Sequence, residues 1–170
     1  MRAIRGFGLL ELMAVLAITG VLISAAVPTY ASFMQRQQLR LAADTLMQDL
    51  RRARELSVNT PVSIFLTFQP GPQWCWGVSR GLPCDCAGSV TSTDKPLARC
   101  DIANADNREQ FKDVMIDTAQ NLEFTPGLGQ VTQSGAAALR TKKGQNLQVV
   151  FSRMGRARLC GRDSPGGQGC

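Results

Sequence analysis

The sequence predicts an α+β fold, in which one long N-terminal helix, half transmembrane and half amphipathic, packs on a C-terminal β-rich domain. Three observations predict it: an apolar run over 7–27, a helical spacing of apolar residues after residue 30, and short apolar runs separated by Gly and Pro after residue 61. The 170 residues therefore divide into a leader over 1–6, a helix over 7–58 with its transmembrane segment at about 7–28, and a globular domain over 59–170.

The apolar run is long enough to cross a membrane. At about 1.5 Å per residue it spans about 30 Å, the thickness of a bilayer's hydrocarbon core. Arg2 and Arg5 precede it and would hold the leader on the cytoplasmic side. The run contains a single carboxylate, Glu11, whose charge costs about 2.5 to 3.5 kcal/mol near the bilayer centre. We therefore expect Glu11 to have a partner that neutralises it.

The leader ends in Gly6, directly before the apolar run. An ordinary secretory signal is cut beyond its apolar core, after an A-x-A-like site. Here the arrangement indicates a cut between Gly6 and Phe7, which keeps the helix in the mature protein. The helix would then serve as both membrane anchor and assembly element.

The second half of the helix is predicted to be amphipathic. Pro28 should kink or locally melt the helix, and helical spacing then resumes from Tyr30 to about Ser57. The sequence Asn59-Thr60-Pro61 should end it. An apolar stripe faces the globular domain, and a charged face lies opposite. The stripe comprises Leu39, Ala43, Leu46, Leu50 and Ala53, and the charged face comprises Arg36, Arg40, Asp44, Arg51 and Arg54.

After residue 61 the composition favours a single β-rich domain. Strands are predicted over 62–68, 74–79 and 147–152, and two shorter runs, 114–116 and 122–124, are further candidates. The stretch 81–107 is predicted to be a long loop, because it lacks an apolar period and holds three of the six cysteines.

The six cysteines predict disulfides rather than a metal site. They lie in a domain that the topology places outside the cytoplasm, where disulfides form. The sequence Cys84-Asp-Cys86 is too tight for the usual zinc spacing, and the chain has no histidine. We expect Cys160 to pair with Cys170, which would fix a short polar tail, and the pairing of the other four cysteines is left open.

Catalysis is not expected. The chain shows no Ser or Cys nucleophile with a plausible base, no carboxylate pair and no phosphate-binding glycine loop. The sequence therefore predicts a protein that is not an enzyme, with neither a cofactor nor a metal.

The positive charge is concentrated near the C-terminus. Residues 127–170 carry seven basic residues against one acidic residue, which accounts for the whole formal charge of +6. Such a region attracts a polyanion, because each phosphate contacted by Lys or Arg releases counterions. Nucleic acid, lipopolysaccharide phosphates and anionic surfaces all qualify. The alternative is a solvated basic face, or one paired with an acidic neighbour in a fibre.

The sequence Gly155-Arg156-Ala157-Arg158 sharpens this prediction. If Gly155 allows a tight turn and the next residues are extended, Arg156 and Arg158 project to the same side and could grip neighbouring phosphates. Charge alone adds further candidates for this contact, namely Lys142, Lys143, Arg153 and Arg162.

The N-terminal segment resembles the class III signal of type IV pilins and pseudopilins: a glycine, a phenylalanine, and a hydrophobic helix with an early glutamate. Gly6, Phe7 and Glu11 match this pattern, whereas Gly8 replaces the threonine that the family often has. The resemblance implies that a prepilin peptidase cuts after Gly6 and methylates the Phe7 amine. It also implies that Glu11 pairs with the Phe7 amine of a neighbouring subunit.

Over its whole length the chain resembles the GspH/FimT family of minor pilins and pseudopilins, through the signal, the helix end LMQDLRRARELSVNTPVSIFL, and the terminal G-R-A-R-L-C. A G-R-x-R motif near the C-terminus looks like the FimT group, whose members are implied in binding DNA during natural transformation. By that resemblance Arg156 and Arg158 carry the DNA contact. The cysteine-rich stretch follows no pattern of this family.

Three functions are consistent with these resemblances. We favour a type IV minor pilin that binds double-stranded DNA without sequence preference for uptake. The second is a structural minor pilin, of the FimU kind, that primes pilus assembly. The third is a pseudopilin of a type II secretion system. The expected partners are other major and minor pilins, the prepilin peptidase and the inner membrane, which the subunit would span once before it joins an extracellular or periplasmic fibre.

Overall fold

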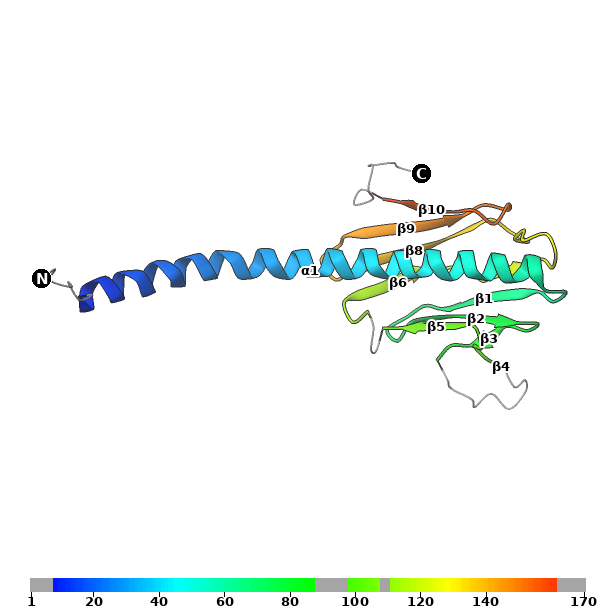
Figure 1. The fold of residues 1–170 in the computed structure, drawn as a ribbon, viewed down its shortest axis with the longest axis horizontal. Coiled ribbons are helices and arrows are strands. Elements are labelled where there is room, and N and C mark those ends of the chain that lie inside the picture. The colour runs from blue at the N-terminus through cyan, green and yellow to red at the C-terminus, as the bar shows by residue number, and fades with distance from the viewer. Residues whose placement is uncertain (1–7, 88–97, 108–110, 162–170) are drawn as a thin grey trace, which may run out of the picture. The chain divides into compact units, whose positions relative to one another are not determined.

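The computed structural model describes residues 8–87, 98–107 and 111–161, drawn in colour in Figure 1. The chain forms two compact units, Met1–Met34 and Gln35–Cys170. One helix, α1 (Leu9–Asn59), contributes to both, and the strands β1 to β10 all belong to the second.

The first unit is an apolar helix whose large apolar side chains, where described, are exposed. Leu10 is 82% exposed and Val21 is 69% exposed. The helix is long and apolar enough to span a membrane, as predicted. Glu11 lies in its first turn, where its backbone N–H donates to the carbonyl of Gly8 at 3.0 Å. Gly6 and Phe7 lie outside the described residues.

The helix runs without a break past residue 28, so the predicted local melting at Pro28 is wrong. A proline inside a helix removes only one backbone donor, and a long helix keeps the hydrogen bonds on either side. Apolar surroundings favour this outcome, since a melted turn would leave further backbone groups unsatisfied. The helix ends at Asn59, one residue beyond the predicted end and within the sequence expected to end it.

In the second unit, α1 packs its apolar stripe into the core. Leu39, Ala43, Leu46, Leu50 and Ala53 are all buried, as predicted, and Ala42 joins them. On the opposite face, the side chains of Arg36, Arg40, Asp44 and Arg51 are exposed, whereas Arg54 is half-buried.

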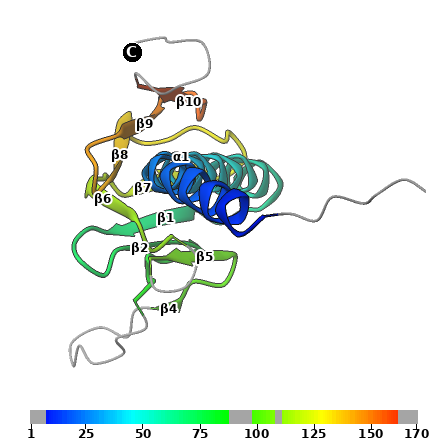
Figure 2. The same cartoon turned by 90° about the vertical axis from the view of Figure 1, so that its left-hand side faces the viewer.

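Two antiparallel sheets curve around this face of the helix (Figures 1 and 2). The first has the strand order β5-β2-β1-β7, and the second has the order β10-β9-β8-β6. The first sheet comprises β1 (Ile64–Gln69), β2 (Cys75–Arg80), β5 (Ala103–Asp106) and β7 (Leu122–Phe124). The second comprises β6 (Val114–Thr118), β8 (Gly135–Thr141), β9 (Asn146–Phe151) and β10 (Ala157–Cys160). A short parallel pair, β3 (Cys84–Asp85) and β4 (Ala98–Arg99), completes the described strands.

The core lies between the helix and the two sheets. Trp74 stacks on Trp76 with ring centroids 5.3 Å apart, and both stack on Phe111. The indole N–H of Trp74 donates to the carbonyl of Val114 at 2.7 Å, which joins the β2 side of the core to β6. The three rings therefore connect the two sheets beneath the helix.

The five predicted strands are present as β1, β2, β6, β7 and β9. The prediction of a long loop over 81–107 is wrong in part, because β5 pairs with β2 along 103–106. β8 was also missed. The sequences of β8 (GAAALRT) and β5 (ANAD) are rich in residues that strands disfavour. These segments form strands because each pairs with a neighbouring strand.

Disulfides tie the edge of the first sheet together, which confirms that prediction in general. Cys75 pairs with Cys86, and Cys84 pairs with Cys100. The side chain of Cys100 lies directly over Gly77 in β2, where a Cβ atom would collide with the sulfur. Cys160 is also disulfide-bonded, whereas Cys170 lies outside the described residues, so the Cys160–Cys170 pairing stays a prediction.

Candidate nucleic-acid interface

The turn between β9 and β10 places two arginines side by side. The N–H of Gly155 donates to the carbonyl of Ser152, and the N–H of Ser152 donates to the carbonyl of Arg156, each at 2.9 Å. β10 then pairs antiparallel with β9, with Arg158 opposite Val150. Arg156 and Arg158 are exposed, and the residue between them is half-buried. The predicted turn and the predicted projection to one side are both present.

Gly155 is required at this turn for two reasons. Its φ is 69°, in the left-handed region that glycine adopts without strain. A Cβ atom at this position would also collide with the carbonyl oxygen of Gly129 and would lie 3.1 Å from Cδ of Arg54. The backbone at Gly155 therefore packs directly against the side chain of a helical arginine.

The loop between β7 and β8 fixes the turn relative to the end of α1. The N–H of Gly127 donates to the carbonyl of Ser57 at 2.7 Å, and the N–H of Val131 donates to the carbonyl of Arg153 at 2.9 Å. One loop thus bonds to the helix at one end and to the β9–β10 turn at the other.

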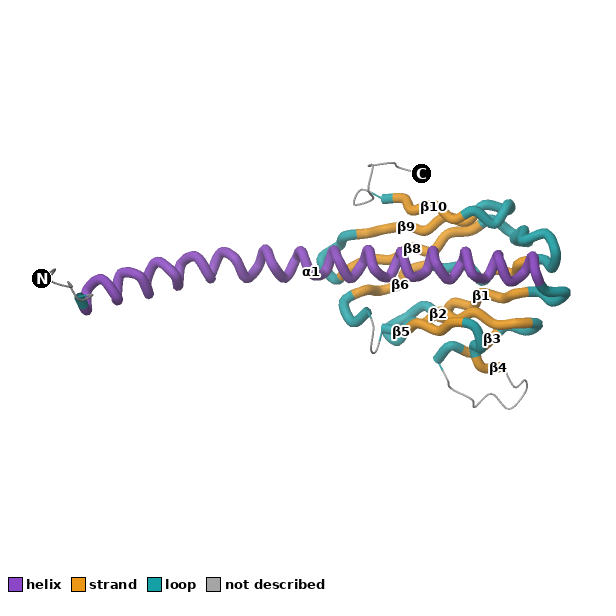
Figure 3. The backbone as a smooth tube through the Cα atoms, viewed as in Figure 1, coloured by secondary structure: helices purple, strands orange, loops and turns teal. Residues whose placement is uncertain are grey.

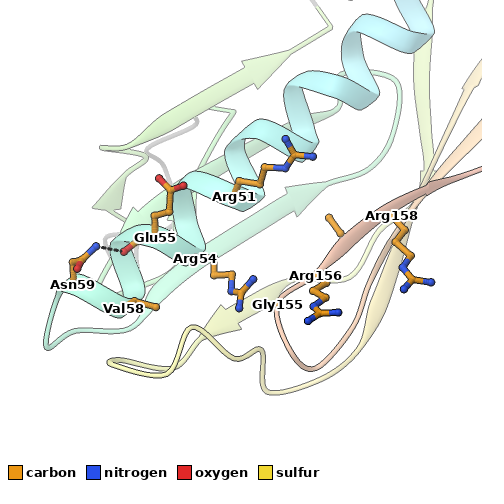
Figure 4. Close-up of a pocket in the computed structure, with 9 residues that line it drawn as sticks. Arg51, Arg54, Glu55, Val58, Asn59, Gly155, Arg156 and Arg158 are labelled. Carbon is orange, nitrogen blue, oxygen red and sulfur yellow. Dashed lines mark hydrogen bonds between the residues drawn. The ribbon is translucent and has the colours of Figure 1, made fainter. Parts of the chain in front are cut away.

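An open groove of about 500 Å³ lies between the helix end and β10 (Figure 4). Four arginines line it, Arg51 and Arg54 from α1 and Arg156 and Arg158 from the turn and β10. Its other lining residues are Glu55, Val58, Asn59, Gly155 and Ala157.

The four arginines leave this groove positively charged. The ion pairs found among the described residues lie elsewhere and join Arg80 to Asp101, Arg140 to Asp117, and Lys142 to Asp113. Glu55 is the single carboxylate of the lining, and Figure 4 shows it directed away from Arg156. The groove therefore has a net charge of three positive units, which suits a polyanion.

The other predicted contacts are not brought into this groove. Arg153 is exposed in the same turn but does not line the groove. Lys142 and Lys143 lie in the β8–β9 turn, at the other end of β9, which at about 3.3 Å per residue is about 20 Å away. Figure 3 shows the two turns at opposite ends of β9. Arg162 lies outside the described residues.

Arg51 and Arg54 line the groove although the sequence did not predict it. Both were predicted on the charged face of the helix, because helical periodicity alone does not show what lies beside that face. The run Arg51-Arg52-Ala53-Arg54 was the available signal, being the densest basic cluster on the helix. Within the described residues, no group of three or more His, Cys, Asp or Glu side chains is placed to hold a metal ion.

The N-terminal segment matches a known processing motif. Residues 1–27 match the prokaryotic N-terminal methylation motif. No curated protein matches the chain by sequence.

Among solved structures, the chain is similar to two crystal forms of the type IV minor pilin FimU from Pseudomonas aeruginosa. One has a TM-score of 0.53 at 18% identity, covering 79% of this chain and 98% of that chain. The other has a TM-score of 0.50 at 17% identity, covering 76% of this chain and 98% of that one. The chain thus combines the methylation motif with the α+β fold of a type IV pilin, as predicted.

Proposed function

We propose that this chain is a minor pilin of a type IV pilus that binds double-stranded DNA for uptake in natural transformation. A prepilin peptidase cleaves it after Gly6 and methylates Phe7. The subunit spans the inner membrane once before it joins other pilins in an extracellular fibre. The methylation motif over residues 1–27 and the pilin fold support the processing and assembly parts of this proposal.

The observation that carries DNA binding is the pair Arg156 and Arg158. Both are exposed, they flank Ala157 at the start of β10 directly after the turn at Gly155, and neither forms an ion pair within the described part of the chain. Guanidinium groups bind phosphate oxygens through two parallel hydrogen bonds, and such contacts carry no sequence information. The turn is held by backbone hydrogen bonds and therefore presents both arginines without needing to reorganise.

A gel-shift titration tests this function. The full-length protein in a non-ionic detergent should retard duplex DNA of unrelated sequences equally, and more weakly as salt rises. Arg156→Ala with Arg158→Ala should abolish the shift at about 0.1 M salt, because both phosphate contacts are lost.

A matched control removes the same charge elsewhere. Arg36→Ala with Lys112→Ala changes two exposed residues outside the groove and should leave the shift intact. Unchanged binding by the Arg156/Arg158 variant would overturn DNA binding through this turn.

The fold similarity to FimU supports a second candidate, a structural minor pilin that primes pilus assembly without touching DNA. In that case the Arg156/Arg158 variant should lower the number of surface pili, whereas the DNA-binding function predicts normal piliation with impaired DNA uptake. Counting pili and measuring transformation in the same strain separates the two.

A further inference from the structure

We propose that helix α1 supplies the second wall of the DNA site, so that one sugar–phosphate backbone lies between Arg51 and Arg54 on the helix and Arg156 and Arg158 on the opposite wall. This inference rests on the proposed function and adds the helical arginines to it. The four side chains come from segments about a hundred residues apart in the sequence, yet they line one groove.

The spacing of the helical pair suits this role. Residues three apart on a helix have Cβ atoms about 5–6 Å apart on the same face. Arg51 is exposed, and Arg54 is half-buried beside it. Arg54 packs against Gly155 so closely that a Cβ atom at residue 155 would lie 3.1 Å from Cδ and 3.2 Å from Nε of Arg54. Figure 4 shows Arg54 reaching from the helix toward the Gly155 turn.

The packing of Arg54 gives it two effects. Its aliphatic stem fills the space beside Gly155 and Gly129. A Cβ atom at residue 155 would lie 3.1 Å from Cδ of Arg54, and a Cβ atom at residue 129 would lie 3.1 Å from Cγ of Arg54. It thereby positions the turn that carries Arg156. Its guanidinium group lies at the groove, where it can donate to a phosphate oxygen.

The lining of the groove points to the phosphate backbone rather than to the bases. None of its nine lining residues is aromatic, so the groove offers no platform on which a base could stack. Its donors are almost entirely guanidinium groups, which match phosphate geometry. Guanidinium groups on both walls would contact oxygens on both sides of one backbone.

Replacing Glu55, the one acidic residue of the lining, tests the role of charge in the opposite direction from replacing an arginine. Glu55 lines the same groove and lies four residues after Arg51. Since the carboxylate repels a phosphate and lowers the potential of the groove, its removal should favour binding.

The experiment measures affinity for a duplex of mixed sequence as a function of salt, using the full-length protein in a non-ionic detergent. Arg51→Ala should weaken binding about tenfold at 0.1 M salt. It should also lower the slope of log affinity against log salt by about 0.9, the value for one lost phosphate contact. Arg54→Met keeps the aliphatic stem against Gly155 and should show the same two changes. Glu55→Gln should bind more tightly than the unaltered protein.

The control is Arg36→Ala, which removes an exposed arginine of the same helix outside the groove and should leave affinity and slope unchanged. Unchanged affinity and slope for both Arg51→Ala and Arg54→Met would overturn the second wall. If the Arg156/Arg158 variant still loses binding in that case, the proposed DNA-binding function stands. If that variant also binds normally, the proposed function itself fails.

Discussion

Asp49 is a carboxylate that the fold partly removes from water. It lies on α1, and the indole N–H of Trp76 donates to its Oδ2 at 2.8 Å. Burial raises the pKa of Asp49 above its ordinary value of 3.8, while the hydrogen bond from Trp76 and the charge of Arg52 act in the opposite direction. The folded state therefore binds this proton more tightly than the unfolded state does. It follows that the free energy of unfolding falls as pH rises from 3.8 through the raised pKa.

Asp49→Asn should remove this cost. Asparagine accepts the Trp76 hydrogen bond with its amide oxygen and carries no charge to desolvate. We expect the variant to be at least as stable as the unaltered protein at pH 7, and its stability to depend less on pH between about 4 and 7. Chemical denaturation across that range measures both. Asp44→Asn, an exposed carboxylate of the same helix, is the control, and a marked loss of stability confined to Asp49→Asn would contradict this account.

At the scale of elements, the short β3–β4 pair beside the first sheet depends on two disulfides more than on its own hydrogen bonds. β3 and β4 have two residues each and, within the described part of the chain, pair only with one another; such a short pairing alone would not hold them in place. Cys84–Cys100 joins the two short strands and passes directly over Gly77. The absence of a side chain at residue 77 therefore makes room for this crosslink.

Gly77→Ala should prevent or displace the Cys84–Cys100 disulfide, because the new Cβ would overlap the Cys100 sulfur. Peptide mapping without reduction should show the loss of that bond. In the chain-entropy view a loop of this length contributes about 3 kcal/mol. Replacing Cys84 and Cys100 by serine should cost a similar amount. Gly77→Ala should add less in that background than it costs alone, because residue 100, whose Cβ would lie 2.8 Å from the new Cβ, is then free to move away. Full additivity of the two effects would count against the crosslink as the reason for Gly77.

At the scale of the whole molecule, the two parts of helix α1 meet different structural requirements. Its first part exposes apolar side chains, with Glu11 in the first turn, and its later part supplies the core stripe and the arginines of the groove. A carboxylate in the first turn is favoured by the helix dipole. That interaction does not neutralise it in lipid, and the pairing that we propose with the Phe7 amine of a neighbouring subunit would supply the missing positive charge.

Glu11→Ala should therefore leave the protein in the membrane but absent from sheared fibres. The apolar span is unchanged by this substitution, whereas the charge proposed to pair with the Phe7 amine of a neighbour is removed. Immunoblots of membrane and sheared-fibre fractions measure the two pools. Thr19→Ala, an exposed position of the same helix, should be incorporated normally, and normal incorporation of Glu11→Ala would refute the pairing.

The sequence alone determined the features that depend on local pattern. The apolar run over 7–27 is continuous and has the length of a membrane-spanning helix, and the stripe from Leu39 to Ala53 repeats at spacings that a helix places on one face. The β-branched and aromatic runs that became β1 and β9 likewise carry their own strand preference. The turn at Gly155 and the projection of Arg156 and Arg158 to one side could be predicted, because both follow from the local sequence and from the alternation of side chains along a strand.

Only the tertiary structure decided what depends on contacts between distant segments. β5 and β8 are strands because neighbouring strands pair with them, and the pairing of Cys75 with Cys86 follows from how β2 and β3 meet. Likewise, Arg51 and Arg54 belong to the groove only because a loop bonded to Ser57 and to Arg153 brings the β9–β10 turn against the helix end. Periodicity states which face of a helix avoids the core, but only the folded chain determines what lies beside that face.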